Sequence, residues 1–551
     1  MIDLPLDRVY HWEQTRPDEV FLTQPMNGVA RDWTWAKTMD EARRVANHLL
    51  SKNWPPGSHI VIYSKNCAWW IIAELAIWMA GHVTVPIYPS LTHQSAGQLF
   101  EHCDPVACFL GPVDVTDPTH LELPAGLEIV RFPNITQPDI AKSWDEIVKT
   151  TQPLTTNTKR GADEIATIIY TSGTTGNPKG AMHRFLAFPY LAQAISQVAG
   201  ERRHSQLSYL PLAHIAERSL TETSAIYHSW HLFFSESTAT FLTDLKRAHA
   251  TVFFSVPRLY AKFQQKVFEK ISRSMLGALL RIPLAKTLVQ RYILRSMGFG
   301  NVQFAASGSA ALPADILLWF LALGLPLTEG YGTTETGITH TSPNGESRPG
   351  YTGRSTPGVE AKVSELGELL LRSPMNMVGY YKNPEESREI LTEDGFIRTG
   401  DLAEITSDGW LKITGRIKEQ FKTAKGKYVV PSKLEALLST YPAVENCLVL
   451  GTNKDAPCAV AVLTASAIRQ ASTEAGRSEL EQSFEELIET VNAKVEVHEH
   501  LGMIVLVRDH WTIDSGFITP TLKLKRLPLE THYGPLISAA IEQGKRVVWS
   551  L

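Results

Sequence analysis

From about residue 35 onward, two hydrophobic periods alternate along the chain. Apolar positions at helical spacing predict helices over 41–50 and 68–80, whereas short β-branched runs predict strands over 59–63 and 83–88. Further strands are expected over 107–111, 165–170, 251–256 and 301–306. Helices that alternate with apolar strands are typical of α/β layers with largely parallel strands.

After about Ser364 the pattern changes to short strands joined by turns. Residues 365–372 are expected to form a strand, and Asp408-Gly409 is typical of a hairpin turn between two strands. The C-terminal part contains new helices at 432–439 and 480–494 and new strands at 444–450 and 458–463. We therefore expect a large domain over 1–417 and a small domain over 418–551, joined by a tight hinge.

Composition limits the classes of protein that remain. A chain of 551 residues is too long for one compact core, and 44% apolar with 20% charged residues is ordinary for a globular protein. The formal net charge of −4 provides no general attraction to nucleic acid, so no nucleic-acid partner is expected. A cytoplasmic protein is expected, because the first residues lack a secretion signal and the apolar window 69–80 is too short to span a bilayer.

The five cysteines are few and unevenly spread, so a disulfide framework is not expected. Cys103 and Cys108, with His102 beside them, hint at a metal site, but no second pair of ligands follows them. Buried free thiols are the favoured interpretation.

Residues 170–183 (YTSGTTGNPKGAMH) carry the strongest chemical signal in the chain. Small and hydroxylated residues after a buried strand let backbone N–H groups and hydroxyls form a concave site for phosphate oxygens. The candidate ligands are Thr171, Ser172, Gly173, Thr174, Thr175, Gly176 and Lys179. The loop is not the P-loop of NTPases, because Gly180 stands where that motif needs a magnesium-binding hydroxyl. An ordinary surface loop is the alternative.

The whole string resembles the signature of the adenylate-forming enzymes, which include acyl-CoA synthetases, luciferase-like enzymes and the adenylation domains of peptide synthetases. Further segments match that pattern in the same order between about residues 165 and 526. The resemblance implies an α/β fold with a large multi-layered N-terminal domain of mixed and parallel sheets, and a small α+β C-terminal lid domain. It also implies ATP, Mg²⁺ and CoA as co-substrate.

Residues 330–336 (GYGTTET) match a second motif of this superfamily. By the resemblance, Tyr331 packs on the adenine, Thr334 holds the α-phosphate, and Glu335 binds Mg²⁺, for which a carboxylate oxygen is a suitable ligand. Other nucleotide contacts are expected from Ser309, Ala310, Glu329, Gly330, Gly332 and Thr333. Without its neighbours, a Gly-Tyr-Gly stretch would indicate only a turn.

Three later segments complete the resemblance. Asp401 is expected on the ribose hydroxyls and Arg416 on the ribose or a phosphate. Lys418 corresponds to the hinge about which the small domain turns, although a solvated surface lysine is the alternative. Gly426 and Tyr428 lie in a loop that lines the CoA tunnel after that movement.

The last motif contains the lysine expected to promote adenylation. We assign this role to Lys523, with Lys525 as the rival, because two positions apart on an extended segment point the same way. Leu522 replaces the usual glycine, a form associated with long-chain synthetases.

The segment 210–218 bears on which acid is activated. Amino-acid-activating relatives have an aspartate here for the substrate amine, whereas this chain has Ala213-His214. A buried ammonium without a carboxylate partner is costly, which disfavours amino acids. We expect His214 to border the substrate carboxylate or the acyl tunnel; a histidine at the edge of the core is the alternative.

Two stretches, 251–260 and 417–431, resemble long-chain acyl-CoA synthetases, so a medium- to long-chain fatty acid is the expected substrate.

Between 266 and 295, seven Lys or Arg accompany a single acid, Glu269, in an amphipathic pattern that Pro283 interrupts. This segment is a candidate for peripheral contact with the inner membrane face, and a solvated helix face is the alternative.

A monomer or homodimer is expected. The rival functions are transfer of the acyl group to a carrier-protein thiol or another nucleophile, and a non-catalytic binding protein.

Overall fold

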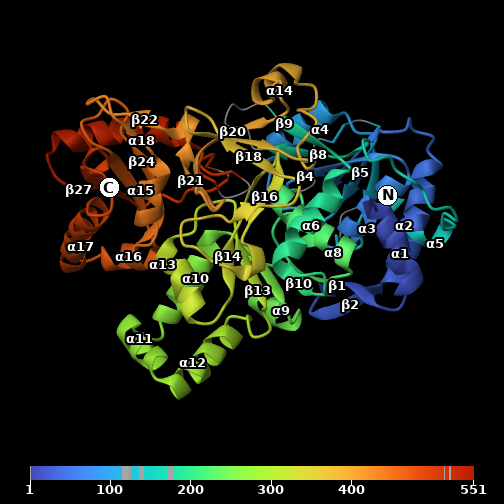
Figure 1. Cartoon of the computed structure of the whole chain (residues 1–551), viewed down its shortest axis with the longest axis horizontal. Helices are drawn as coiled ribbons and strands as arrows, with labels where there is room; N and C mark the ends of the chain where they lie inside the picture. Colours follow the sequence, from blue (N-terminus) through green and yellow to red (C-terminus); the bar gives the residue numbers. More distant parts are fainter. Residues whose placement is uncertain are drawn as a thin grey trace.

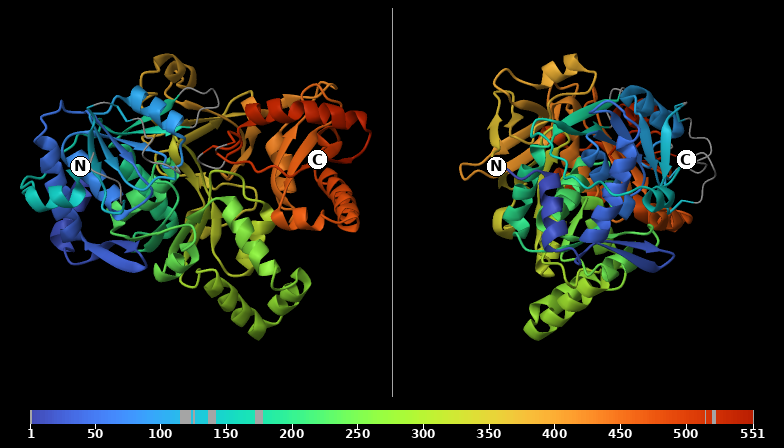
Figure 2. Two further views of the ribbon diagram at one scale, coloured as in Figure 1. Left: turned by 180° about the vertical axis from the view of Figure 1, so that it is seen from behind. Right: turned by 90° about the vertical axis from the view of Figure 1, so that its right-hand side faces the viewer.

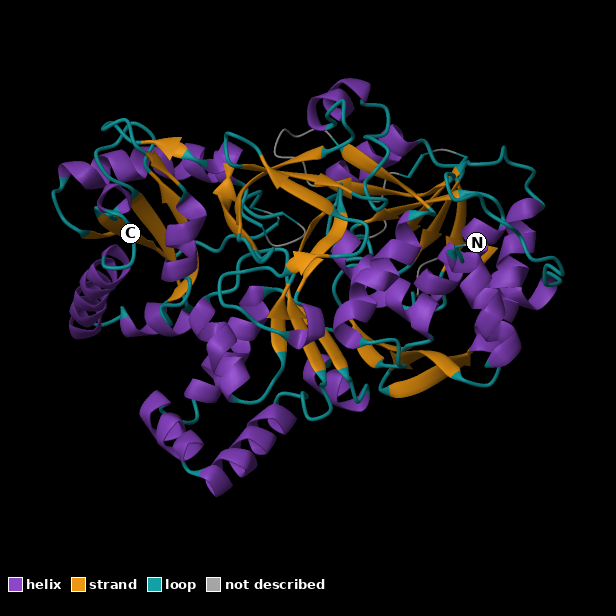
Figure 3. Ribbon diagram, viewed as in Figure 1, coloured by secondary structure: helices purple, strands orange, loops and turns teal. Residues whose placement is uncertain are grey.

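The computed structural model describes residues 2–114, 123–124, 126–135, 142–171, 178–513, 515–519 and 523–550. A large N-terminal part and a smaller C-terminal part lie next to each other along the longest axis of the molecule (Figure 1). Mixed sheets and helices fill both parts (Figure 3), as the resemblance implied. Among the described helices, none combines the length and apolarity needed to cross a bilayer.

One sheet of the N-terminal part has the strand order β7-β6-β5-β3-β4-β8-β9. Its strands are β3 (His59–Tyr63), β4 (Val83–Ile87), β5 (Ala107–Leu110), β6 (Glu128–Arg131), β7 (Lys142–Ser143), β8 (Ile165–Thr171) and β9 (Lys179–Arg184). The strands are parallel except for the β8–β9 hairpin, in which Thr171 is paired with Lys179. The strands predicted at 59–63, 83–88, 107–111 and 165–170 are thus confirmed to within one residue.

A second sheet has the order β14-β13-β12-β10-β11-β1-β2. It contains β1 (Val20–Met26), β2 (Val29–Thr34), β10 (Ser205–Ser208), β11 (His231–Phe234), β12 (Val252–Ser255), β13 (Phe304–Ser307) and β14 (Leu327–Glu329). Only β1 and β2 pair antiparallel, so the carboxyl ends of the other strands meet at one edge of the sheet. In open α/β sheets this is the edge at which ligands bind.

The helices of the N-terminal part cover these sheets. They are α1 (Pro5–Thr15), α2 (Trp35–Leu50), α3 (Ala68–Met79), α4 (His93–Cys103), α5 (Trp144–Thr150), α6 (Ala187–Ala199), α7 (Ile215–Glu217), the π-helix η2 (Arg218–Thr223), α8 (Ser224–His228), α9 (Phe241–Arg247), α10 (Pro257–Phe268), α11 (Arg273–Arg281), α12 (Pro283–Ser296) and α13 (Ala314–Ala322). Every residue of α3 is buried, in a core that includes strands of both sheets. Burial between layers therefore explains why this helix has almost no polar residues.

Shorter antiparallel sheets follow, as the change of pattern predicted. They comprise β15 (Tyr331–Thr333), β16 (Gly337–Thr341), β17 (Arg354–Ser355), β18 (Glu360–Val363), β19 (Glu368–Arg372), β20 (Ile397–Ile405) and β21 (Leu411–Arg416), with η3 (Pro343–Gly345) and α14 (Pro384–Ile390) between them. Asp408-Gly409 forms the predicted turn between β20 and β21. The strand predicted over 365–372 is shorter at its start, because Gly367 adopts φ +80° in the turn before β19.

The C-terminal part follows η4 (Ile417–Glu419) and has its own sheet, β24-β25-β26-β27. Its elements are β22 (Phe421–Lys422), β23 (Tyr428–Val429), α15 (Pro431–Leu438), β24 (Val444–Leu450), β25 (Cys458–Leu463), α16 (Ala465–Gln470), α17 (Glu474–Asn492), η5 (Val497–Glu499), β26 (Met503–Val507), α18 (Arg526–Glu542) and β27 (Val547–Trp549). Both predicted strands are confirmed, and α17 begins earlier than predicted because Thr473 caps it by accepting a hydrogen bond from the N–H of Gly476. The boundary between residues 417 and 418 stays a prediction.

Each face of this small sheet has a separate apolar core. Leu434 and Phe484, from α15 and α17, pack on one face, and Leu529 and Ile537, from α18, pack on the other. Both cores consist of residues from 421 onward. The C-terminal part therefore has the packing expected of a domain with its own core.

Candidate active site

A cavity of about 540 Å³ opens where the two parts of the chain meet. The carboxyl ends of β13 and β14 form its floor through Ser307 and Glu329, and the β15–β16 hairpin crosses it. From the C-terminal side, η4 and the segment that includes Lys523 complete the wall. The cavity thus lies at the sheet edge that the parallel strands define.

Most of the predicted site residues meet in this cavity. The residues that line it are Thr171, Lys179, His214, Ser309, Glu329, Gly330, Tyr331, Gly332, Thr333, Thr334, Glu335, Arg416, Lys418 and Lys523. Residues Ser172, Gly173, Thr174, Thr175 and Gly176 lie outside the described part of the chain. Ala310, Asp401, Gly426 and Tyr428 do not line the cavity.

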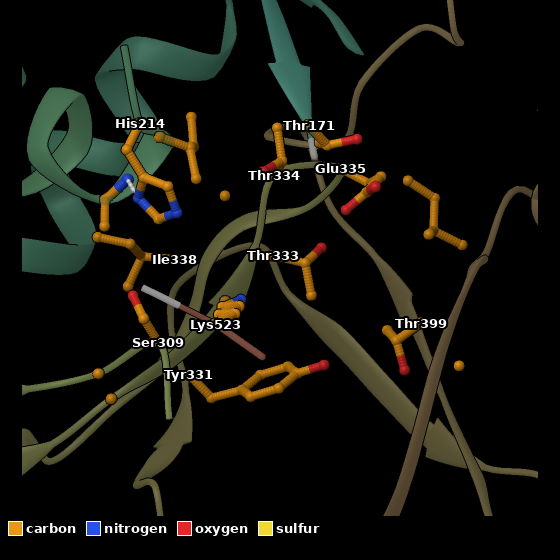
Figure 4. A pocket seen from close by; sticks show the side chains of 18 of the residues that line it. Thr171, His214, Ser309, Tyr331, Thr333, Thr334, Glu335, Ile338, Thr399 and Lys523 are labelled. Atoms are coloured by element: carbon orange, nitrogen blue, oxygen red, sulfur yellow. Dashed lines mark hydrogen bonds between the residues drawn. The ribbon is translucent and has the colours of Figure 1, made fainter. Parts of the chain in front are cut away.

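Figure 4 shows how the polar groups are distributed around this space. Thr171, Thr334 and Glu335 lie together at one end, and the ring of Tyr331 lies at another. Lys523 enters between them, and His214 stands on the side opposite Thr399. Hydroxyl, carboxylate and ammonium groups from distant segments therefore face one space.

Asp401 lies at the hydroxyl end of the Tyr331 side chain. The Tyr331 hydroxyl donates a hydrogen bond to Oδ2 of Asp401 at 2.5 Å, and Nε of Arg416 pairs with Oδ1 at 2.7 Å. Burial raises the pKa of the Asp401 carboxyl, and the adjacent Arg416 opposes that shift. Strands β20 and β21 set this geometry by placing Asp401 opposite Arg416 in the ladder.

Glu335 is held from outside the predicted motif. The hydroxyl of Tyr380 donates to Oε1 of Glu335 at 2.7 Å, and the backbone N–H of Met377 donates to the Glu335 carbonyl at 2.8 Å. Both contacts fix the carboxylate beside Thr171 and Thr334 (Figure 4). A fixed carboxylate with neighbouring hydroxyls is a ligand set that suits a hard divalent cation.

Lys179 has a partner that the sequence motifs did not indicate. Its ammonium pairs with Glu386 of α14, and burial, together with the charge of Lys418, lowers its pKa. The side chain of Glu386 is anchored in turn by Nδ2 of Asn383 at 2.8 Å. Because Glu386 follows Lys179 by 207 residues, no local pattern could have linked them.

His214 lines the cavity and is half-buried. Its Nδ1 accepts a hydrogen bond from the backbone N–H of Ala216 at 3.2 Å, which caps the first turn of α7. Burial, reinforced by the charge of Lys523, lowers the pKa of the imidazole to about 3. Apolar side chains line this side of the cavity, namely Ile195, Val198, Ile215, Leu220, Phe254 and Ile338.

The two candidate lysines have different surroundings. Lys523 lines the cavity and stays accessible from it, and its pKa is lowered because the surrounding protein desolvates the ammonium and Arg416 repels it. Lys525 is the N-cap residue of α18 and does not line the cavity. Residues 523–525 stay extended, because the N–H of Lys525 donates to the carbonyl of Phe517 and the N–H of Thr519 donates to the carbonyl of Lys523. The choice of Lys523 over Lys525 therefore rests on the cavity lining and stays a prediction.

Two further residues have backbone or burial features that the motifs did not predict. Ser309 adopts φ +67°, a left-handed conformation that a non-glycine residue rarely takes and that is common at functional sites. Glu329 accepts from the backbone N–H of Leu312 at 3.1 Å, and burial raises its pKa to about 7. The carboxyl of Glu329 therefore fixes the loop after β13 that carries Ser309.

Two protein-family models match this chain. The model of the AMP-binding enzyme family matches residues 9–381, and that of the AMP-binding enzyme C-terminal domain matches residues 418–543. The chain belongs to the AMP-binding enzyme family. As a member of this family it is an adenylate-forming ligase that uses ATP, and the predicted resemblance is confirmed.

Named relatives of this AMP-binding enzyme extend over nearly its whole length. It is 29% identical to the long-chain-fatty-acid–CoA ligase FadD15 of Mycobacterium tuberculosis, over 96% of this chain and 96% of that protein. It is 27% identical to the peroxisomal long chain acyl-CoA synthetase 6 of Arabidopsis thaliana, over 93% of this chain and 82% of that protein.

Solved structures agree on the fold of the family. The adenylation domain of a carboxylate reductase from Mycobacterium chelonae matches with a TM-score of 0.83 at 21% identity, covering 98% of this chain and 91% of that one. Anthranilate CoA ligase AuaEII, solved with anthranoyl-AMP, matches with a TM-score of 0.78 at 21% identity over 98% of both chains. The predicted fold of the adenylate-forming enzymes is therefore confirmed.

Proposed function

We propose that this AMP-binding enzyme joins a medium- to long-chain fatty acid to ATP, giving an acyl adenylate and pyrophosphate, and then transfers the acyl group to CoA with release of AMP. The observation that carries the proposal is the continuity of one cavity from a polar end, at Thr171 and Glu335, to an apolar wall that includes Ile215 and Phe254. The names of the relatives support the same substrate class.

The acyl side of the cavity favours an uncharged tail. His214 is neutral there, with its pKa lowered to about 3, and the neighbouring residues that line this wall are apolar. The described residues of α7 and η2 that line the cavity, Ile215, Ala216 and Leu220, are apolar, so a substrate ammonium against them would lose its water without gaining a charged partner. The expected substrate is therefore a fatty acid and not an α-amino acid.

Adenylation proceeds by attack of the substrate carboxylate on the α-phosphorus of ATP. Lys523 and the hydroxyls of Thr171 and Thr334 stabilise the negative charge that spreads over the phosphate oxygens. Tyr331 supports the adenine, and Asp401 with Arg416 binds the ribose. Glu335 would hold Mg²⁺, which supplies charge neutralisation at the phosphates when bound.

Thiol transfer needs a different set of groups at the same place. Gly426 and Tyr428 lie on the β22–β23 hairpin outside the cavity, and the Tyr428 side chain is 61% exposed. We assign the hinge to Lys418, in η4 between β21 and β22, and the domain boundary to residue 417. Rotation there would remove Lys523 from the cavity and bring the hairpin to it.

Two rival functions remain to be distinguished by assay. One is delivery of the acyl group to a carrier-protein thiol or another nucleophile, which shares the adenylation step; among the fold neighbours is the adenylation domain of a carboxylate reductase. The other is a non-catalytic binding protein, which is disfavoured by Lys523 and Glu335 in the cavity and by Asp401 bonded to its Tyr331. A cytoplasmic location is part of the proposal.

The test has two separate readouts. Pyrophosphate exchange with a panel of fatty acids, acetate and free amino acids reports the first step, and CoA-dependent release of AMP reports the second. Exchange with medium- to long-chain acids and AMP release that requires CoA are expected. Robust exchange with an amino acid, or with acetate alone, contradicts the substrate class. Exchange without CoA-dependent AMP release contradicts CoA as the acceptor.

A further inference from the structure

The hairpin formed by α11 and α12 projects from the body of the enzyme. It is inserted between α10 and β13, and it extends away from both the N-terminal and the C-terminal parts in Figure 1 and in both views of Figure 2. Pro283 begins α12, so the interruption that this proline predicted separates the two helices. Leu276 and Ile293 are buried and attach the hairpin to the core below β12 and β13.

The charge of this hairpin is uniform. From Lys270 to Ala314 the chain contains no Asp or Glu, although its net charge is −4. Five cations lie on α11 and α12, namely Arg273, Arg281, Lys286, Arg291 and Arg295. Within the described ranges, none of the five forms an ion pair. The hairpin therefore presents uncompensated positive charge on a chain that is negative overall.

Large apolar side chains are exposed among these cations. Met275 is 55% exposed, Ile282 54%, Leu288 67% and Tyr292 76%, and they are spread over both helices and the connection between them. They contribute little to the core, because Leu276 and Ile293 face it instead. Exposed apolar groups on a projecting element that also carries cations are typical of an interfacial membrane anchor and not of a solvated helix face.

We propose that the α11–α12 hairpin docks on a bilayer that contains anionic lipids. The cations match the negative surface potential of such a membrane, and Met275, Ile282 and Leu288 match the boundary between headgroups and acyl chains. Tyr292 has the amphipathic ring that concentrates at this interface. Nucleic acid fits less well, because aliphatic side chains gain nothing from a phosphate backbone.

Docking has a functional consequence that rests on the proposed function. A long-chain fatty acid partitions into the bilayer, so a docked enzyme meets its substrate where that substrate is concentrated. The hairpin continues from α10, which follows β12, and β12 supplies Phe254 to the apolar wall of the cavity. Binding to vesicles is measured without ATP or CoA, so failure of this proposal and failure of the proposed activity are separate results.

The experiment measures co-sedimentation of the full chain with vesicles of phosphatidylcholine alone and of phosphatidylcholine with a quarter of phosphatidylglycerol. Binding to the anionic vesicles is expected to exceed binding to neutral ones by at least about tenfold and to weaken as salt is raised. A charge variant, Arg281→Gln/Lys286→Gln/Arg291→Gln, and an apolar variant, Met275→Ser/Leu288→Ser/Tyr292→Ser, are each expected to lose most of the binding.

Matched controls remove the same kinds of side chain elsewhere. Lys149→Gln/Lys494→Gln/Lys545→Gln removes three exposed cations, and Val29→Ser/Leu366→Ser/Val497→Ser removes three exposed apolar groups. Both controls are expected to bind like the unmodified protein. Thermal melting of every variant checks that the fold is retained, and single substitutions replace any triple variant that melts early.

Three outcomes overturn the proposal. The first is equal binding to neutral and anionic vesicles, or binding to neither. The second is hairpin variants that bind as well as the controls. The third is a change in sedimentation coefficient without lipid in the hairpin variants only, which would identify a second copy of the chain as the occupant of this surface.

Discussion

The hydroxyl of Tyr331 donates a 2.5 Å hydrogen bond to Asp401, 70 residues further along the chain. This contact joins the β15 strand of the adenine motif to the β20 strand of the ribose motif. Since Arg416 uses the other oxygen of Asp401, the residues proposed to contact the adenine and the ribose form one unit held together by the protein's own contacts. Such preorganisation reduces the entropy that binding must overcome.

The first prediction concerns this unit. Asp401→Asn keeps the shape of the side chain but removes its charge, so Arg416 loses its partner and the ribose loses a charged acceptor. The KM for ATP is expected to rise on the order of 10- to 100-fold, the range for hydrogen bonds to a charged group. Steady-state kinetics with varied ATP measures this change. Tyr331→Phe is the control that removes one hydroxyl only. If it raises the KM for ATP more than Asp401→Asn does, the charge of Asp401 is not the main contribution and the prediction is contradicted.

Lys523→Ala is expected to lower kcat for adenylate formation by on the order of 10²- to 10³-fold, as for other single electrostatic donors in an active site. It should leave thioester formation from supplied acyl adenylate nearly unchanged, because this lysine acts only while the α-phosphate is attacked. Lys525→Ala, which alters a lysine outside the cavity, is the matched control. Loss of pyrophosphate exchange in the control alone would transfer the role to Lys525.

Lys418→Pro tests the proposed hinge. Proline fixes φ near −65° and removes the backbone freedom that a rotation at this residue needs. The thioester step is therefore expected to fall much more than adenylation, with Lys418→Ala as the control for loss of the side chain. The two half-reactions are assayed separately, by pyrophosphate exchange and by consumption of acyl adenylate with CoA. Equal losses in both would place the pivot elsewhere.

A fourth prediction concerns stability and pH at Glu217. This carboxyl is buried, accepts a hydrogen bond from the hydroxyl of Ser208 at 2.9 Å, and has its pKa raised by burial from 4.5 to about 8. As pH rises from about 4.5 to about 8, the unfolded chain has released this proton while the folded chain still holds it, so the carboxyl contributes progressively less stability. The stabilising contribution of Glu217 is complete below a pH of about 4.5 and is lost above a pH of about 8.

Glu217→Gln removes this titration and keeps the shape of the side chain. Its melting temperature relative to the unmodified protein is therefore expected to increase between pH 5 and pH 8, as thermal melts in a pH series would measure. Taking the difference between the two proteins cancels the contribution of other groups, including His214, whose lowered pKa acts in the opposite direction below pH 6.5. A difference that stays constant across the series contradicts the prediction.

Local pattern was sufficient for several short strands. The strands at 59–63, 444–450 and 458–463 were predicted to the residue, because turns or polar positions bound each apolar run. The start of α17 was missed, since its first turn is polar and is defined by the Thr473 cap. Sequence order could not supply the contact of Lys179 with Glu386 or of Glu335 with Tyr380, because both arise from packing between distant segments.

The cysteines have a consequence for an enzyme that makes an activated acyl group. All five are buried free thiols, and burial raises their pKa values, to about 12 at Cys67 and Cys103 and to about 11 at Cys458. None of them lines the cavity. At neutral pH the protein therefore exposes no cysteine thiolate to an acyl adenylate, and acylation of its own cysteines cannot compete with the acceptor for the product of the first step.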